Sequence, residues 1–230
     1  MRRVLLVLPV LAAGWWALPA APASAAPGCA PGGTPPPAGA AHRQVGDLDG
    51  DGQPDTLWVG EFRGADGPTV RVVGVTTASG ASSDVEVPSA SPMPLSALAV
   101  DAQNDGGNQV IVSDGRGARL YTFADCRLQT VVDGHYGRPF LFDMQNLRDQ
   151  GTGVGCSDFG DGRRLVALQA SQTGGQWSVR RTEIDVSGTR ASTGRSDTVT
   201  AASAQDPAVT SAQTISCGDL TIGKDGVQQP

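Results

Sequence analysis

The sequence predicts an all-β fold made of repeated units, and three observations support this. Short runs of β-forming residues alternate with turns rich in Gly, Asp and Ser. Beyond the amino-terminal segment, no stretch sustains the i, i+3, i+4, i+7 apolar spacing of an amphipathic helix. An Asp/Gly-rich segment at 47–58 also returns in weaker form, at 101–112, 155–166 and 217–226.

The amino terminus has the three parts of a secretory signal. Met1-Arg2-Arg3 is a basic start, an apolar run follows from Val4 to Leu18, and Ala23-Ser24-Ala25 fits the small-residue cleavage rule. We therefore expect a signal peptide over 1–25 and a secreted protein, extracellular or associated with the cell wall. No later stretch is long and apolar enough to cross a bilayer, so we expect no membrane span.

Composition divides the rest of the chain in two. Residues 26–41 are rich in Pro, Gly and Ala, which predicts an extended arm. Residues 42–230 form the repeat region and are long enough to bury one core.

With 17 Lys and Arg against 23 Asp and Glu, the chain has a formal net charge of −6, which argues against nucleic acid as a partner.

Four cysteines, Cys29, Cys126, Cys156 and Cys217, follow the signal segment. An exported chain with an even number of cysteines is expected to form disulfides, and four cysteines allow three pairings. The chain has no C-x-x-C spacing, so redox catalysis and a zinc knuckle have little support.

A cluster of carboxylates in the first Asp/Gly-rich segment predicts a calcium site. Calcium takes oxygen ligands, and close carboxylates repel one another without a cation between them. The alternative is a metal-free turn, because Asp and Gly both favour turns. The expected ligands are the side chains of Asp47, Asp49, Asp51 and Asp55 and the backbone carbonyl of Gln53.

The residues around this loop do not fit an EF-hand. Its twelfth position is Trp58, where an EF-hand needs a bidentate Glu. The flanking segments 42–46 and 56–60 are too short and too rich in β-formers or Gly for helices. The loop is therefore expected to join two strands.

From Gly46 to Leu57 the chain reads Gly-Asp-Leu-Asp-Gly-Asp-Gly-Gln-Pro-Asp-Thr-Leu. This resembles the calcium loop of the FG-GAP/VCBS repeat family, the integrin-alpha-like propellers, and departs from its pattern only at Thr56. The resemblance implies a secreted bacterial β-propeller in which the loop lies between the first and second strands of a blade. For this chain it implies about three blades plus a terminal partial blade.

Each unit is expected to contain several short strands. The partial blade at 217–226 is expected to be completed by a strand at 42–45, or to remain open in a small stack or in half of a dimer. The expected strands are 56–59, 69–76 and 84–87 in the first unit, 98–100, 109–113, 119–123 and 128–132 in the second, and 165–170, 176–186 and 196–201 in the third.

The later copies of the loop are poorer in acids. The second keeps Asp101 and Asp105 but has Gln103 and Gln109 where the first has carboxylates, so we expect weak affinity at most. The third has a phenylalanine, Phe159, at a ligand position, and the fourth has a lysine beside its Asp. One strong calcium site is expected.

The resemblance also implies a disulfide pairing. In the repeat alignment Cys156 and Cys217 both fall at the end of a first strand, and first strands lie near one another around a propeller axis. This implies a Cys156–Cys217 bridge and leaves Cys29 to pair with Cys126, which would clamp the arm to the second blade.

Signals for catalysis are weak. The two histidines, His42 and His135, are expected to be exposed, and no serine lies in a G-x-S-x-G elbow. Trp58 and Trp177 are expected to pack in the core. The expectation is therefore a protein that is not an enzyme, a calcium-stabilised binding or scaffold module for an extracellular protein or glycan. The alternative is an extracellular metal-dependent hydrolase whose carboxylate cluster holds the metal.

Overall fold

The computed structural model describes residues 28–229, apart from 64–66 and 68. Within these residues the chain is built almost entirely of strands, which confirms the predicted all-β class. The two helices of this part, α1 (Pro207–Ser211) and α2 (Ile222–Asp225), are both far too short to cross a membrane. The expected signal peptide over 1–25 lies outside the described residues.

Three sheets form the body of the molecule. The first has the strand order β1-β5-β4-β3-β2, the second β11-β8-β7-β6-β19 with β9 beside β8, and the third β10-β16-β15-β14-β13-β12. Consecutive long strands pair antiparallel within each sheet. The first sheet comprises Gly32–Gly33 (β1), Ala41–Gln44 (β2), Thr56–Arg63 (β3), Thr69–Thr76 (β4) and Ala81–Glu86 (β5). The second comprises Ser96–Asp101 (β6), Asn108–Ser113 (β7), Gly117–Ala124 (β8), Arg127–Thr130 (β9), Leu141–Asp143 (β11) and Val227–Gln228 (β19). The third comprises Val132–Asp133 (β10), Asn146–Leu147 (β12), Gln150–Asp158 (β13), Arg163–Thr173 (β14), Gln176–Ser187 (β15) and Arg190–Ala201 (β16).

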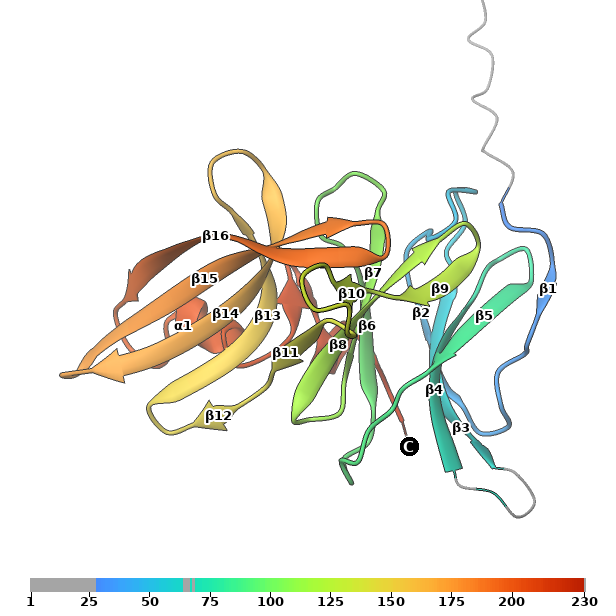
Figure 1. Ribbon diagram of the computed structural model, residues 1–230, viewed down its shortest axis with the longest axis horizontal. Helices are drawn as coiled ribbons and strands as arrows, with labels where there is room; N and C mark the ends of the chain where they lie inside the picture. Colours follow the sequence, from blue (N-terminus) through green and yellow to red (C-terminus); the bar gives the residue numbers. More distant parts are fainter. Residues whose placement is uncertain (1–27, 64–66, 68, 230) are drawn as a thin grey trace, which may run out of the picture.

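The second sheet is packed on both of its faces, between the first and the third (Figure 1). In β6, Ala97 and Ala99 belong to the core shared with the first sheet, whereas Leu98 and Val100 belong to the core shared with the third. Successive side chains of a strand point to opposite faces, so a strand covered on both faces buries both sets of side chains. All residues of β7 are buried for the same reason.

The outer face of the third sheet is covered by α1. Val209 and Ala212 pack there against side chains of β14 and β15, including Trp177. Asp206 caps this helix by accepting the N–H of Ala208, and proline occupies its first turn. Five residues are too few to show a helical period in the sequence, so the Asp-Pro pair is the one local signal for α1.

All ten strands expected from the sequence lie within or overlap observed strands, and 69–76 matches β4 at both ends. The long strand β13 was not predicted, because glycine at every second position weakens a strand pattern. These glycines make room for the carboxyl-terminal segment. A Cβ on Gly153 would lie 2.5 Å from the carbonyl oxygen of Thr214, and one on Gly151 would lie 2.7 Å from the Gln213 side chain.

The prediction of a fourth, partial blade at 217–226 is wrong. Residues 216–221 form a small hairpin of β17 (Ser216–Cys217) and β18 (Leu220–Thr221), α2 follows, and β19 then pairs with β6 in the second sheet. The expected closing strand at 42–45 is β2, which pairs with β3 in the first sheet. The Asp-Gly pair at 225–226 marks the end of α2, and Asp225 accepts the N–H of Thr221 there. Asp and Gly favour many kinds of turn, so this pair alone did not identify a blade.

Candidate metal centre

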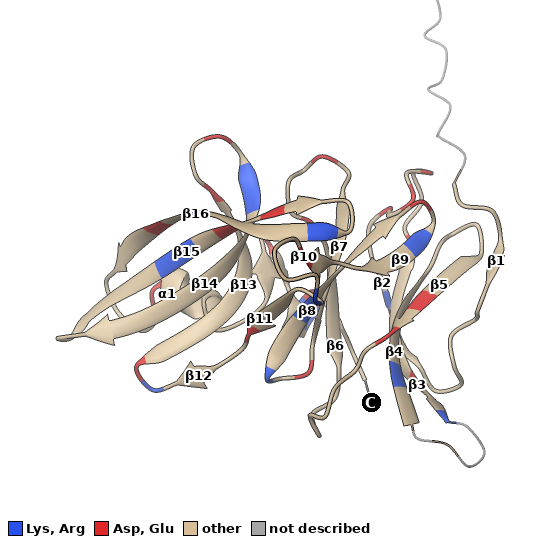
Figure 2. Ribbon diagram, viewed as in Figure 1, with Lys and Arg blue, Asp and Glu red and all other residues tan. Residues whose placement is uncertain are grey.

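The candidate metal loop lies between neighbouring antiparallel strands, as expected. We call residues 45–55, between β2 and β3, the first loop, residues 102–107, between β6 and β7, the second loop, and residues 159–162, between β13 and β14, the third loop. The three loops lie at the same, upper edge of the three sheets in Figure 1. Figure 2 shows acidic residues on all three.

Three of the predicted carboxylates come together in the first loop. Asp47, Asp49 and Asp55 each offer an oxygen, and these oxygens all lie within 4.8 Å of one another. This spacing allows one small cation to contact all three carboxylates. Without a cation the three negative charges repel one another, so backbone N–H groups must hold them in place.

Asp55 is the buried member of the group, with 1% of its surface exposed. Its Oδ2 accepts the N–H of Leu48 at 2.7 Å, and its Oδ1 accepts the N–H of Ala78 at 2.9 Å. Burial raises the pKa of the Asp55 carboxyl above its ordinary value, the two N–H groups oppose this shift, and the charges of Asp49 and Asp47 add to it. A bound cation would favour the ionised form of this carboxyl.

Asp47 shapes the turn itself. Its two oxygens accept the N–H groups of Gly50 and Gly52, each at 2.7 Å. Both glycines have positive φ angles, 81° and 83°, which other residues rarely adopt. The alternating Gly and Asp residues therefore fold the chain back so that Asp47 and Asp55 meet.

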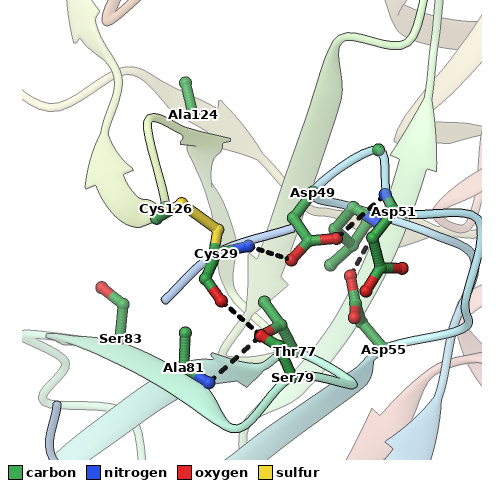
Figure 3. Close-up of a disulfide and its surroundings, with 12 residues drawn as sticks. Cys29, Asp49, Asp51, Asp55, Thr77, Ser79, Ala81, Ser83, Ala124 and Cys126 are labelled. Atoms are coloured by element: carbon green, nitrogen blue, oxygen red, sulfur yellow. Dashed lines mark hydrogen bonds between the residues drawn. A yellow bond between two sulfur atoms is a disulfide. The ribbon is translucent and has the colours of Figure 1, made fainter. Parts of the chain in front are cut away.

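Asp49 is held from outside the loop. Its Oδ2 accepts the N–H of Cys29 at 2.8 Å (Figure 3), and its Oδ1 accepts the N–H of Asp51 at 3.3 Å. The fourth predicted carboxylate, Asp51, is not one of the three whose oxygens converge. Its Oδ1 accepts the N–H of Gln53, an exposed residue, at 2.7 Å.

The second loop repeats the hydrogen bonds of the first with fewer acids. Asp101 accepts the N–H of Gly106, as Asp47 accepts that of the equivalent Gly52, and it also accepts the N–H of Asp105. Gln109 stands where the first loop has Asp55, and its Oε1 accepts the N–H of Ala102 at 3.0 Å, as Asp55 accepts that of Leu48. The gap-free alignment of 101–112 on 47–58 is therefore the structural one, and an amide replaces the buried carboxylate.

The third loop is stabilised by arginines. The guanidinium groups of Arg181 and Arg195 both contact the Phe159 ring, each 4.8 Å from its centre. Arg195 also pairs with Asp161 and with Glu183. Two guanidinium groups thus contact the side chain at the position that corresponds to a metal ligand in the first loop, and an aromatic ring offers no oxygen to a cation there.

Side chains connect the three loops in series. Nδ2 of Asn108, at the end of the second loop, donates to the carbonyl of Leu48 in the first loop at 3.1 Å. Arg163, at the end of the third loop, donates to the carbonyls of Ala102 and Asp101. Between the first and second loops lies an open groove of about 510 Å³, whose lining includes Asp49, Asp105, Asn108, Phe123 and Cys126.

The structure contains two disulfides, Cys29–Cys126 and Cys156–Cys217, the pairs that the resemblance implied. Such bonds indicate an oxidising compartment. The position of Cys217 is nevertheless not the expected one, because it lies in the β17–β18 hairpin and not in the first strand of a blade. Cys29 lies directly beside the carboxylate group, and Cys126 lies in the turn between β8 and β9.

Residues considered for catalysis lie apart from one another. His42 is exposed on β2, and His135 is exposed in a turn after β10. Trp58 and Trp177 are buried, as expected. The indole N–H of Trp58 donates to the hydroxyl of Thr76 at 3.1 Å.

Comparison of this chain with protein-family models, with curated proteins and with solved structures gave no match.

Proposed function

We propose that the protein is an exported, calcium-stabilised module that binds or scaffolds an extracellular protein or glycan. The observation that carries this proposal is the convergence of Asp47, Asp49 and Asp55 in a loop whose sequence resembles that of FG-GAP/VCBS repeats. Three carboxylates offer the hard oxygen ligands that calcium prefers. The repeated strand-loop-strand units are consistent with a relative of the propeller blades of that family.

A binding role agrees better with this geometry than a catalytic one. Every oxygen of the three carboxylates already accepts a backbone N–H, an arrangement that holds ionised groups in place for a cation. A catalytic metal needs, in addition, an open ligand position and a nearby base. The groove between the first and second loops offers a surface next to the cation where a partner can bind.

Thermal unfolding tests the calcium site. Calcium that binds only the folded state stabilises it by about 2.7 kcal/mol at a concentration one hundred times Kd. We therefore expect the melting temperature to rise with calcium and to fall with a chelator, and we expect Asp49→Ala to abolish the difference. Equal melting curves of the unmodified protein in calcium and in chelator would refute the proposal.

The second loop supplies a matched control. Asp47 and Asp101 occupy equivalent positions and each accepts two backbone N–H groups, so Asp47→Asn and Asp101→Asn perturb similar local hydrogen bonds. Only Asp47→Asn should reduce the response to calcium. An equal loss in both variants would mean that the response reflects general loop stability and not a ligand set.

A further inference from the structure

We call the amino-terminal residues 28–33 the strap. Its first residues, Gly28 and Cys29, lie beside the carboxylate group, and few hydrogen bonds hold the strap in place. The N–H of Cys29 donates to Asp49, and the hydroxyl of Ser79 donates to the carbonyl of Cys29 at 2.5 Å (Figure 3). Further along, β1 pairs with β5 over two residues only. Residues 30–35 are exposed. Backbone with so few contacts lies at the low-stability end of a structure.

One covalent bond connects the strap to the next sheet. Cys29 is 4% exposed, and its disulfide partner Cys126 lies in the exposed turn between β8 and β9. The bond spans 97 residues of sequence and joins the first sheet to the second. Closing so long a loop removes much of the freedom of the strap, and Cys126 is placed where a small reductant can approach it.

We propose that the strap is latched by the Cys29–Cys126 disulfide and positions Asp49, so that reduction of this bond releases the strap from the carboxylate group. A dithiol reductant supplies two electrons and two protons. The S–S bond breaks, Cys29 and Cys126 become thiols, and the reductant closes its own disulfide.

Release of the strap removes the Cys29 N–H from Asp49, leaving the longer bond from Asp51 as the remaining donor among the described residues. Repulsion from Asp47 and Asp55 then favours orientations of Asp49 that point away from them. A cation must bring the side chain back, so its affinity falls. This consequence rests on the proposed calcium site, whereas the latch itself does not.

Hydrogen exchange tests the latch without any metal. In Cys29→Ala/Cys126→Ala we expect the amides at positions 29 and 32 to exchange at least about 10-fold faster than in the oxidised chain. Their acceptors, Oδ2 of Asp49 and the carbonyl of Gly80, hold these amides only while the strap is docked. Amides of β14 and β15 report whether the variant is folded. Cys156→Ala/Cys217→Ala is the matched control, and its strap should exchange as in the unmodified chain. Unchanged protection in the Cys29 and Cys126 variant would overturn the proposal.

Calcium titration by calorimetry tests the consequence. The loss of a hydrogen bond to a charged group predicts about 10-fold weaker binding in the Cys29 and Cys126 variant. Linkage is reciprocal, so saturating calcium should make the reduction potential of this disulfide about 30 mV more negative. Equal affinity in the two forms would contradict the positioning role.

Gly28→Ala provides a second variant that keeps the disulfide. A Cβ at this position would lie 2.8 Å from Oδ2 of Asp49 and 2.9 Å from Cβ of Asp51, so the strap and the carboxylates cannot both keep their places. We expect weaker calcium binding with normal disulfide formation, and an unchanged affinity would also count against the positioning role. If the oxidised chain binds no calcium at all, the proposed function fails, and hydrogen exchange alone decides whether the strap is latched.

Discussion

The surroundings of two carboxyl groups in this protein shift their pKa values in opposite directions. Asp114, in the turn after β7, accepts the hydroxyl of Ser89 at 2.5 Å and the N–H groups of Gly117 and Arg116. Burial alone would raise the pKa of the Asp114 carboxyl, but these donors and the charge of Arg119 lower it below 3.8. Asp84 on β5 differs, because burial raises its pKa.

These opposite shifts predict that substitutions of the two residues change the stability in opposite directions at pH 7. Both changes should become smaller in acid. A lowered pKa in the folded state means that ionised Asp114 stabilises the protein above the ordinary pKa of an unfolded Asp, about 3.9, and that this contribution is lost as the pH falls through the folded pKa. We expect Asp114→Asn to cost about 1–3 kcal/mol at pH 7 and less in acid. Asp84→Asn should stabilise at pH 7, and its gain should also shrink in acid. Urea unfolding at pH 7 and pH 3 measures both, and a cost of Asp114→Asn that does not change with pH would contradict the assignment.

At the scale of the element, the same strand-loop-strand unit is stabilised in different ways. In the first loop carboxylates converge, and in the second loop an amide replaces the buried acid. In the third loop the Phe159 ring makes cation–π contacts with Arg181 and Arg195. The third loop therefore needs no cation for its own stability.

The third loop gives a direct test of this difference. Each cation–π contact at an exposed site contributes about 0.5–1 kcal/mol, so Phe159→Ala should lower the free energy of unfolding by about 1–2 kcal/mol. Phe159→Leu keeps apolar volume without an aromatic face and should recover only part of the loss. Neither variant should change the response of melting to calcium, and a loss of that response would show that the third loop is coupled to the first.

Local sequence patterns predicted the loops and most strands, because these features depend on nearby residues. Asp and Gly at alternating positions define the turn of the first loop, and the hydrogen bonds of the second loop confirm their alignment. The Gly-rich strand β13 was missed, because its glycines are needed to make room for the distant segment 211–216, and no local pattern reveals that contact. Asp51 was predicted as a ligand from spacing alone, but its side chain turns to the N–H of Gln53.

Over the whole molecule, the carboxyl-terminal segment departs most from expectation. Its Asp-Gly pair suggested a further blade, yet the segment returns to the middle of the molecule and adds β19 to the second sheet. The Cys156–Cys217 bridge fastens the start of this segment to β13, and the two cysteines are separated by 61 positions in the sequence. Short strands of two residues have too little pattern to be placed from sequence, and their partners are decided by tertiary packing.

The end of this segment connects the first two sheets through one side chain. Oε1 of Gln229 accepts the N–H of Leu95 at 3.1 Å and the guanidinium of Arg71, while its Nε2 donates to Glu61 at 2.6 Å. Arg71 and Glu61 lie on β4 and β3 of the first sheet, and Leu95 precedes β6 of the second. Gln229 therefore holds together groups from separate layers, and its removal takes away the acceptor of the Leu95 N–H, whereas Arg71 keeps the carbonyls of Ser91 and Met93.

We expect Gln229→Ala to lower the free energy of unfolding by about 1–3 kcal/mol, because partly buried polar groups lose their hydrogen bonds. The neighbouring variant Gln228→Ala removes an exposed side chain and should stay within about 0.5 kcal/mol of the unmodified protein. A double-mutant cycle with Arg71→Ala should show a coupling of at least about 0.5 kcal/mol, since contacting residues are not additive. Chemical denaturation measures all three, and additive effects of the Arg71 and Gln229 variants would show that the two side chains act independently in joining the sheets.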